Sequence, residues 1–374
     1  MNKFATDHFV KSLYAKRPLP LAYRPGMTDE ERAAWKAALK EKVVEMLAFS
    51  EDRYEEPIVN LLARKDRGSY ILEKYEISPE PELWMSFLML IPKEASEENK
   101  TPGVVCTPGT LWRKECLAGE EFFDLEYEPA QPPNGLSHRY YYANAMAQHY
   151  VRHGITAIAC DDLVSGEHRG HLSPADVEHL LLAQGRSLMG LTVELRLAIM
   201  QFLKTRPFVD KERLAISGHS LGVDSAMHVV LLDEDVKAFV YNDFICDWQE
   251  RILNICPPET APVNSWHLDP GVHRYFTYPD LLAAFAPRKL FITEGGKTEY
   301  LEGLRAVYAE LGAEDCYRYD YYPDYAAPAS RHHEEEKLHP EMTHAEYFEY
   351  CNVVPEKHFF KFEAAAPWLA EALR

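Results

Sequence analysis

The sequence has no long apolar run, and its first residues, Met1 to Asp7, lack the apolar core of a secretory signal. A membrane-spanning helix needs about 20 consecutive apolar residues, so we expect no such helix in this chain. A cytoplasmic protein is the default expectation, although a secreted protein whose signal had been removed would look the same.

Cysteines at metal-binding or redox spacing are also missing. The seven cysteines are scattered along the chain, no two form a Cys-x-x-Cys pair, and at least one must be unpaired. This spacing argues against a zinc ribbon and against a thioredoxin-like motif.

Basic residues are scarce relative to acidic ones. The 374 residues include 40 Lys and Arg against 59 Asp and Glu, which gives a formal net charge of −19. Since nucleic acids and anionic lipid surfaces attract positive charge, neither nucleic acid nor a membrane is an expected partner. Hydrophobic residues make up 47% of the chain, which is ample for a sizeable core.

The first part of the chain, residues 1–56, is expected to form a charged helical arm. Thr28 and Glu31 have the spacing of a capping box, ahead of a helix that should run to about Ala48. Apolar residues recur on one stripe of this helix: Trp35, Leu39, Val43, Met46 and Leu47. We expect the arm to pack on the main domain or on a second subunit, which leaves a homo-oligomer open.

Residues 57–374 are expected to form one α/β domain. Strand-like runs at Ile58–Ala63, Tyr70–Ile77 and Trp84–Ile91 predict an antiparallel meander. From Gly103 onward strands alternate with helices, which predicts a mostly parallel central sheet flanked by helices on both faces. The predicted strands are Gly103–Cys106, Ile155–Cys160, Val236–Tyr241, Lys289–Thr293 and Cys316–Tyr322, and the predicted helices are Asn144–His153, Gln184–Thr205, Tyr278–Phe285, Glu299–Leu311 and Phe362–Leu373. Two long connections, residues 107–143 and 323–361, are expected to carry function.

The domain is organised around the run from Arg213 to Gly222. An apolar strand leads into Gly-His-Ser-Leu-Gly, and an amphipathic helix from Val223 to Leu232 follows. This context predicts a nucleophile elbow, in which Gly218 and Gly222 relieve clashes on both sides of a sharp turn. The helix N-terminus then stabilises developing negative charge. We therefore predict that Ser220 is a catalytic nucleophile.

A serine nucleophile needs a base within hydrogen-bond reach, and the base needs an orienting carboxylate. The base should precede the last helix, where five histidines stand: His332, His333, His339, His344 and His358. His358 is the predicted base because it lies shortly before the closing amphipathic helix.

Three carboxylates compete for the orienting role. Asp243 follows the strand after the nucleophile helix, and Glu294 and Glu299 flank the end of the next strand. Many hydrolases carry an Asp near this second position, where Thr298 stands here. Asp243 is therefore the preferred acid, ahead of Glu299 and then Glu294.

The oxyanion hole requires two N–H donors. The backbone of Leu221, directly after the nucleophile, should supply one. The loop after the first parallel strand should supply the other, from Thr110 or Leu111, because Gly109 permits a close turn. Arg113 in the same loop could bind a carboxylate of a substrate.

Charged residues follow another strand end, at Asp161-Asp162 and Glu167-His168-Arg169. They do not show the convergent ligand geometry of a metal site, so no metal and no cofactor are predicted. Asp224, on the nucleophile helix, is expected to be a buried, hydrogen-bonded carboxylate.

These motifs resemble the α/β-hydrolase superfamily. Gly-His-Ser-Leu-Gly, the run Tyr278–Ile292, and the stretches Pro108-Gly109-Thr110, Lys114–Glu120 and Ala145-Met146-Ala147 are similar to its acetyl xylan esterase and dienelactone-hydrolase-like branch. Glucuronoyl esterases carry an Asn-acid pair after the same strand, which Asn242-Asp243 resembles. They also carry an Arg beside the nucleophile, where this chain has Leu221.

The resemblance implies an α/β-hydrolase fold over residues 57–374 and a serine esterase that cleaves a carboxylic ester through an acyl-enzyme. Ser220, Asp243 and His358 would form the triad, and a small-molecule or carbohydrate ester, such as an acetylated sugar, would be the substrate. The alternatives are a catalytically silent binding protein on the same fold, or a peptidase.

Overall fold

The computed structural model describes residues 4, 6–13, 18–110, 112–120, 138–247, 269–336 and 342–374. The strands in chain order are β1 (Ile58–Asp66), β2 (Tyr70–Glu80), β3 (Leu83–Pro92), β4 (Thr101–Thr107), β5 (Thr156–Cys160), β6 (Val209–His219), β7 (Val236–Asn242), β8 (Lys289–Ile292) and β9 (Tyr317–Tyr319). The helices are α1 (Thr6–Leu13), α2 (Asp29–Leu47), α3 (Lys114–Ala118), α4 (His138–Ala143), α5 (Met146–Val151), α6 (Pro174–Leu182), α7 (Leu188–Lys204), α8 (Gly222–Leu232), α10 (Tyr278–Phe285), α11 (Thr298–Glu310), α12 (His344–Tyr350) and α13 (Phe362–Ala372).

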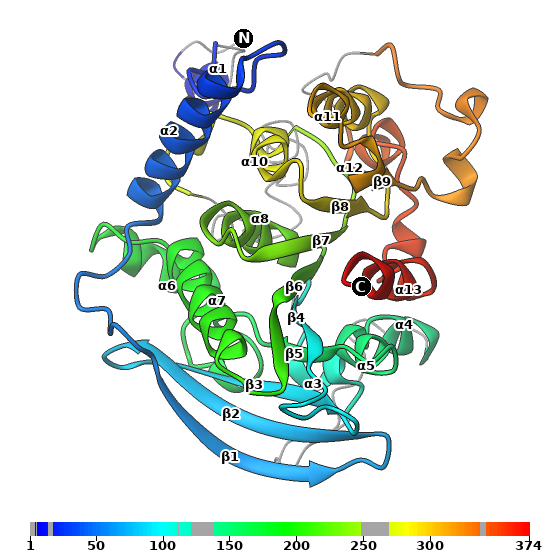
Figure 1. The fold of residues 1–374 in the computed structure, drawn as a ribbon. Helices are drawn as coiled ribbons and strands as arrows, with labels where there is room; N and C mark the ends of the chain where they lie inside the picture. The colour runs from blue at the N-terminus through cyan, green and yellow to red at the C-terminus, as the bar shows by residue number, and fades with distance from the viewer. Residues whose placement is uncertain are drawn as a thin grey trace.

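One twisted sheet runs through the molecule in the order β1-β2-β3-β5-β4-β6-β7-β8-β9 (Figure 1). The pairs β1–β2, β2–β3 and β3–β5 are antiparallel, and the pairs from β5 to β9 are parallel. This confirms the predicted antiparallel meander followed by a parallel sheet. Strands β4, β6, β7 and β8 are consecutive neighbours, so the loops that follow them meet at one edge.

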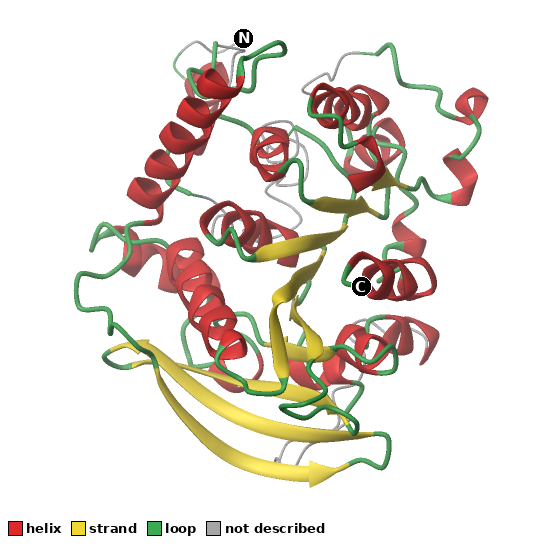
Figure 2. Cartoon of the chain, viewed as in Figure 1, coloured by secondary structure: helices red, strands yellow, loops and turns green. Residues whose placement is uncertain are grey.

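Helices cover both faces of the sheet (Figure 2). Side chains of α2, α7, α8 and α10 form one apolar core with residues such as Val105 and Ile216 from one face. Side chains of α3, α5 and α13 form a second core with Val104 and Ala215 from the other face. Alternate residues of the buried strands therefore serve the two cores, as the period of a strand requires.

The helical arm packs on this domain. Thr28 and Glu31 make the predicted capping box of α2, and the predicted apolar stripe is buried. A Cβ on Gly190 of α7 would stand only 2.1 Å from the carbonyl oxygen of Leu47, at the end of α2. Glycine at position 190 therefore permits the close approach of the two helices. The division at residue 56 and a second subunit remain predictions.

Two segments differ from the sequence-based expectation. The single helix predicted over Gln184–Thr205 begins only at Leu188, because Gly185 has φ +72° and Ser187 caps the helix. Before that break lies α6, which was not expected from the sequence. The strand predicted over Cys316–Tyr322 is confined to β9, and the connection over 323–361 contains α12. Among the described helices, none combines the length and apolar composition needed to cross a membrane.

Candidate active site

Ser220 occupies a sharp turn between β6 and α8. Its φ is +51°, in the left-handed region that non-glycine residues seldom adopt. A Cβ on Gly218 would come within 2.8 Å of the backbone of Val223, and one on Gly222 within 2.4 Å of the Thr107 carbonyl oxygen. The two glycines therefore leave room for a strained turn, which is the geometry of a nucleophile elbow.

The loop after β4 packs directly on this turn. A Cβ on Gly109 would stand 3.1 Å from the Ser220 Cβ, and the Thr107 hydroxyl donates to the Gly222 carbonyl at 2.8 Å. Thr110 follows in this loop and is half-buried, and Leu221 directly precedes α8. Both predicted oxyanion donors therefore belong to segments that adjoin the nucleophile. Their role stays a prediction, and Leu111 lies outside the described residues.

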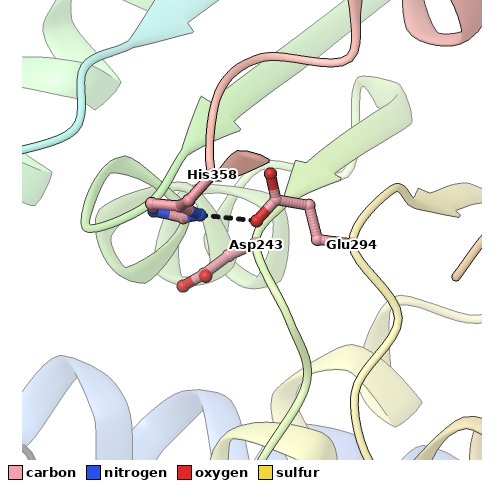
Figure 3. A group of neighbouring side chains, drawn as sticks. All are labelled: Asp243, Glu294 and His358. Carbon is pink, nitrogen blue, oxygen red and sulfur yellow. Dashed lines mark hydrogen bonds and ion pairs between the residues drawn. The ribbon is translucent and has the colours of Figure 1, made fainter. Parts of the chain in front are cut away.

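His358 lies between a short turn, Pro355–Lys357, and α13. Its ring centroid is 4.9 Å from that of His219, the residue before Ser220. The imidazole Nδ1 pairs with the Glu294 Oε2 atom at 2.6 Å, and Figure 3 shows this bond. An Nδ1–H that donates to a carboxylate leaves Nε2 as a proton acceptor, which is the tautomer a general base requires.

Asp243 lies beside this pair on the segment that follows β7 (Figure 3). Ligand atoms of Asp243, Glu294 and His358 all lie within 4.8 Å of one another. The Asp243 carboxylate also accepts from the Phe244 N–H at 2.9 Å. The sequence favoured Asp243 as the acid, and the structure gives the imidazole a hydrogen bond to Glu294. The third candidate, Glu299, is exposed in the first turn of α11.

The spacing of these three residues is also compatible with a metal ion. However, Glu294 already uses one carboxylate oxygen on His358 and the other on the ammonium of Lys361. A cation would compete with both partners and would lie close to the Lys361 ammonium, so the donors present fit a hydrogen-bonded cluster better than a metal site.

A contact between two loops brings the carboxylates together. The N–H of Ile245, after β7, donates to the Gly295 carbonyl at 2.9 Å, and Ile245 forms a bridge with Gly296. A Cβ on Gly296, whose φ is +126°, would lie 2.2 Å from the Ile245 carbonyl oxygen. The glycine pair thus lets the loop after β8 approach the loop after β7.

Asn242 holds several segments of the site in place. Its carbonyl accepts from the Ser220 N–H at 2.9 Å, and its amide Nδ2 donates to His219 Nδ1 at 2.9 Å. Its Oδ1 accepts from the Thr293 hydroxyl at 2.7 Å and from the Lys361 N–H at 2.8 Å. One side chain therefore links the ends of β6, β7 and β8 to the segment that carries His358.

Neighbouring charges and burial shift the pKa values of the titratable groups in the site. Burial opposes ionisation of Glu294, but the charges of His358 and Lys361 hold its pKa well below the usual range. Burial likewise disfavours imidazolium at His358, yet the Glu294 carboxylate raises its pKa above the ordinary value. Burial lowers the pKa of His219 to about 3, so this ring is neutral near pH 7. Glu294 can therefore stabilise an imidazolium that forms at His358.

Four other histidines stand in the same region of the sequence as His358, and three of them lie among the described residues. His333 pairs with Glu336 at 2.8 Å, and His332 is exposed. His344 begins α12, and His339 lies outside the described residues. Thr298, at the position where many hydrolases carry the acid, donates to Glu334 at 2.9 Å.

The acidic residues after β5 surround a buried lysine. The Lys114 ammonium lies 2.8 Å from Asp161, 2.6 Å from Glu167 and 2.9 Å from Glu115. Arg196 pairs with Asp162 at 2.9 Å. Protein cations thus occupy the space that a metal would need. Asp224, expected to be buried, is 1% exposed.

A small cavity of about 20 Å³ adjoins the residue after the nucleophile. Its wall is formed by residues of α7, of α8 and of the loop after β5: Asp162, Leu163, Leu188, Met189, Thr192, Leu221 and Ser225. A volume of this size holds one or two water-sized groups.

Comparison with known proteins agrees with this geometry. A solved structure from Bacteroides fragilis, named as a putative acetyl xylan esterase, superposes with a TM-score of 0.86 at 29% identity and covers 99% of this chain and 95% of its own. A glucuronoyl esterase from Solibacter usitatus matches with a TM-score of 0.54 at 13% identity over 81% of this chain and 88% of its own, which shows a shared fold.

A curated sequence relative, the putative hydrolase YtaP of Bacillus subtilis, is 24% identical over 174 residues, or 44% of this chain. The match spans 57% of the YtaP length. The sequence model of the Abhydrolase family matches residues 3–371, nearly the whole chain. With the elbow and the sheet order, this confirms the predicted α/β-hydrolase fold, and the chain belongs to the Abhydrolase family.

Proposed function

We propose that the protein is a serine esterase that hydrolyses short-chain carboxylic esters, with esterified sugars as the favoured substrates. The observation that carries the proposal has two parts: a strained serine elbow, and a histidine that lies against His219, the residue before the serine, with its Nδ1 bonded to a buried carboxylate. These are the parts of a nucleophile, a base and an orienting acid.

In the proposed reaction the Ser220 hydroxyl attacks the acyl carbon, and its proton passes to Nε2 of His358. Glu294 stabilises the imidazolium through Nδ1–H, and Asp243 adds a second negative charge nearby. Backbone N–H groups of Leu221 and Thr110 would hold the oxyanion. The imidazolium returns the proton to the departing alcohol, and a water molecule, deprotonated by His358, releases the carboxylic acid and restores the serine.

Two observations support a short acyl group. The cavity beside Leu221 has room for a methyl-sized group, and the Bacteroides fragilis neighbour is named as a putative acetyl xylan esterase. The proposed acyl group is therefore acetyl, and the alcohol part of the ester is proposed to be a sugar.

The test is a pair of measurements on the purified protein and its Ser220→Ala variant. The protein should hydrolyse p-nitrophenyl acetate and be labelled by a fluorophosphonate probe, and both activities should vanish in the variant. A folded protein that neither turns over the ester nor reacts with the probe would instead be a catalytically silent binding protein. A panel of acetyl and butyryl esters of sugars then tests the acyl preference, and cleavage of peptides instead of esters would indicate a peptidase.

A further inference from the structure

Lys361 stands three residues after the predicted base and points back to the acid. Its ammonium bonds the Glu294 Oε1 atom, the oxygen that His358 does not use. The same ammonium donates to the carbonyls of Lys357 and Phe359, each at 2.7 Å. The side chain is 19% exposed. Lys361 therefore joins the acid to both sides of the turn that carries His358.

The charges around the imidazole explain what this lysine can do. Among the described residues, the titratable groups that face His358 are Glu294 after β8, Asp243 after β7, His219 at the end of β6, and Lys361 itself. His219 is neutral, so among these groups the Lys361 ammonium is the cation that opposes the two carboxylates at the imidazole. A second nearby carboxylate stabilises the imidazolium form, so the base would already be protonated near neutral pH.

We propose that Lys361 is a positioning residue that fixes the Glu294 carboxylate against His358 and offsets the charge of Asp243, which keeps the imidazole free to accept the serine proton. This inference rests on the proposed esterase function. The ammonium acts through Glu294 and through the field at His358, and it does not touch the reacting atoms. It is close enough to Asp243 for the two charges to interact.

Loss of the charge at residue 361 should shift the pH dependence of activity in one direction, whereas loss of a merely structural contact should not shift it. Removal of the positive charge at residue 361 makes the surroundings of His358 more negative, so the imidazole holds its proton to a higher pH. The acidic limb of the kcat/KM profile should therefore move upward. A loss of packing alone would lower kcat/KM by the same factor at every pH.

The experiment measures kcat/KM for p-nitrophenyl acetate against pH in the full-length protein. Lys361→Met should move the acidic limb up by about one pH unit, the low end of the effect of one nearby charge. Lys361→Arg, which keeps the charge, should leave the limb close to that of the wild type. Addition of Asp243→Asn to Lys361→Met should move the limb back down, because it removes a negative charge that favours the imidazolium.

An acidic limb that is unchanged in Lys361→Met, or that moves equally in Lys361→Arg, overturns the proposal. If Lys361→Met does not fold, as judged by circular dichroism, Lys361→Gln decides, since it keeps a hydrogen-bond donor and removes the charge. Failure of both Lys361→Met and Lys361→Gln to fold, while Lys361→Arg folds and is active, would assign Lys361 a structural role and also overturn the proposal. Esterase activity that persists in Ser220→Ala would refute the proposed function itself, whereas serine-dependent activity with an unmoved limb refutes only the role of Lys361.

Discussion

The two buried ion clusters at the carboxyl ends of the strands differ in what stands at their centre. In the cluster after β5 a lysine, Lys114, is surrounded by three carboxylates, and the side chains of Lys114 and Asp161 are 0% exposed. In the cluster after β7 and β8 an imidazole, His358, takes the central place and is 24% exposed. A permanent cation satisfies its acidic neighbours at all times, whereas an imidazole can gain and lose a proton near neutral pH. The Lys114 cluster is therefore suited to stabilising the fold, and the His358 cluster is suited to proton transfer.

The largest expected effect tests the second cluster. Glu294→Gln should lower kcat/KM by about 10³- to 10⁴-fold, because the imidazolium loses its bonded counter-charge and the correct tautomer is no longer enforced. Asp243→Asn should cost less than about tenfold, since it leaves the Nδ1–carboxylate bond in place. Both variants are compared in ester hydrolysis at a fixed pH. The opposite ranking would assign the orienting role to Asp243, as the sequence favoured.

Disruption of the Lys114 cluster should lower the stability of the folded protein. Lys114→Met leaves three carboxylates without their central cation, and breaking a buried pair of this kind costs about 3–5 kcal/mol in the free energy of unfolding. Urea denaturation measures the change. The matched control, Lys100→Met, alters an exposed lysine and should change the stability by less than about 0.5 kcal/mol. A Lys114→Met protein as stable as the control would contradict the structural role of the cluster.

A smaller loss of stability is expected from a change at Glu167, a carboxylate of the Lys114 cluster. Burial opposes ionisation of Glu167, but Lys114, Lys74 and Ser86 lower its pKa to about 2. A depressed carboxylate pKa stabilises the folded state above the unfolded value, and this stability is lost as the pH falls from about 4.3 toward 2. Glu167→Gln should thus be less stable than the wild type by about 1–3 kcal/mol at pH 7. The difference should shrink in acid, as followed by thermal unfolding between pH 7 and pH 3.

The mildest prediction concerns the wild-type enzyme. Because Glu294 raises the pKa of His358 above its ordinary value, the imidazole is protonated and inactive over a wider acidic range. Activity should therefore decline on the acidic side beginning above about pH 6.5. A profile of kcat/KM against pH gives the limb directly, and a decline that begins only near pH 5 would argue against a strong His358–Glu294 interaction.

Much of the architecture could be predicted because it depends on local signals. The elbow was visible in its two glycines, the capping box of α2 in Thr28 and Glu31, and the sheet in the alternation of apolar runs. The start of α7 was predicted too early, at Gln184 instead of Leu188, because apolar periodicity does not mark a helix boundary. There the backbone conformation of one glycine and the cap at Ser187 outweigh periodicity.

The acid could not be settled from the sequence for a physical reason. Whether Asp243 or Glu294 reaches the imidazole depends on how the loops after β7 and β8 pair, and that pairing is made by the backbone of Ile245 with Gly295 and Gly296. The adjacent glycines were a signal for a close backbone approach, but they do not name its partner. Lys361 was missed because its contact with Glu294 joins residues 67 positions apart.

Asn242 has one further consequence. Because its side chain and carbonyl bind the end of β6, the Thr293 hydroxyl after β8 and the segment before α13, the turn that carries Ser220 and the segment that carries His358 share one anchor. Parts of the surface connections that do not contact this anchor can change, and substrate preference with them, without displacing it.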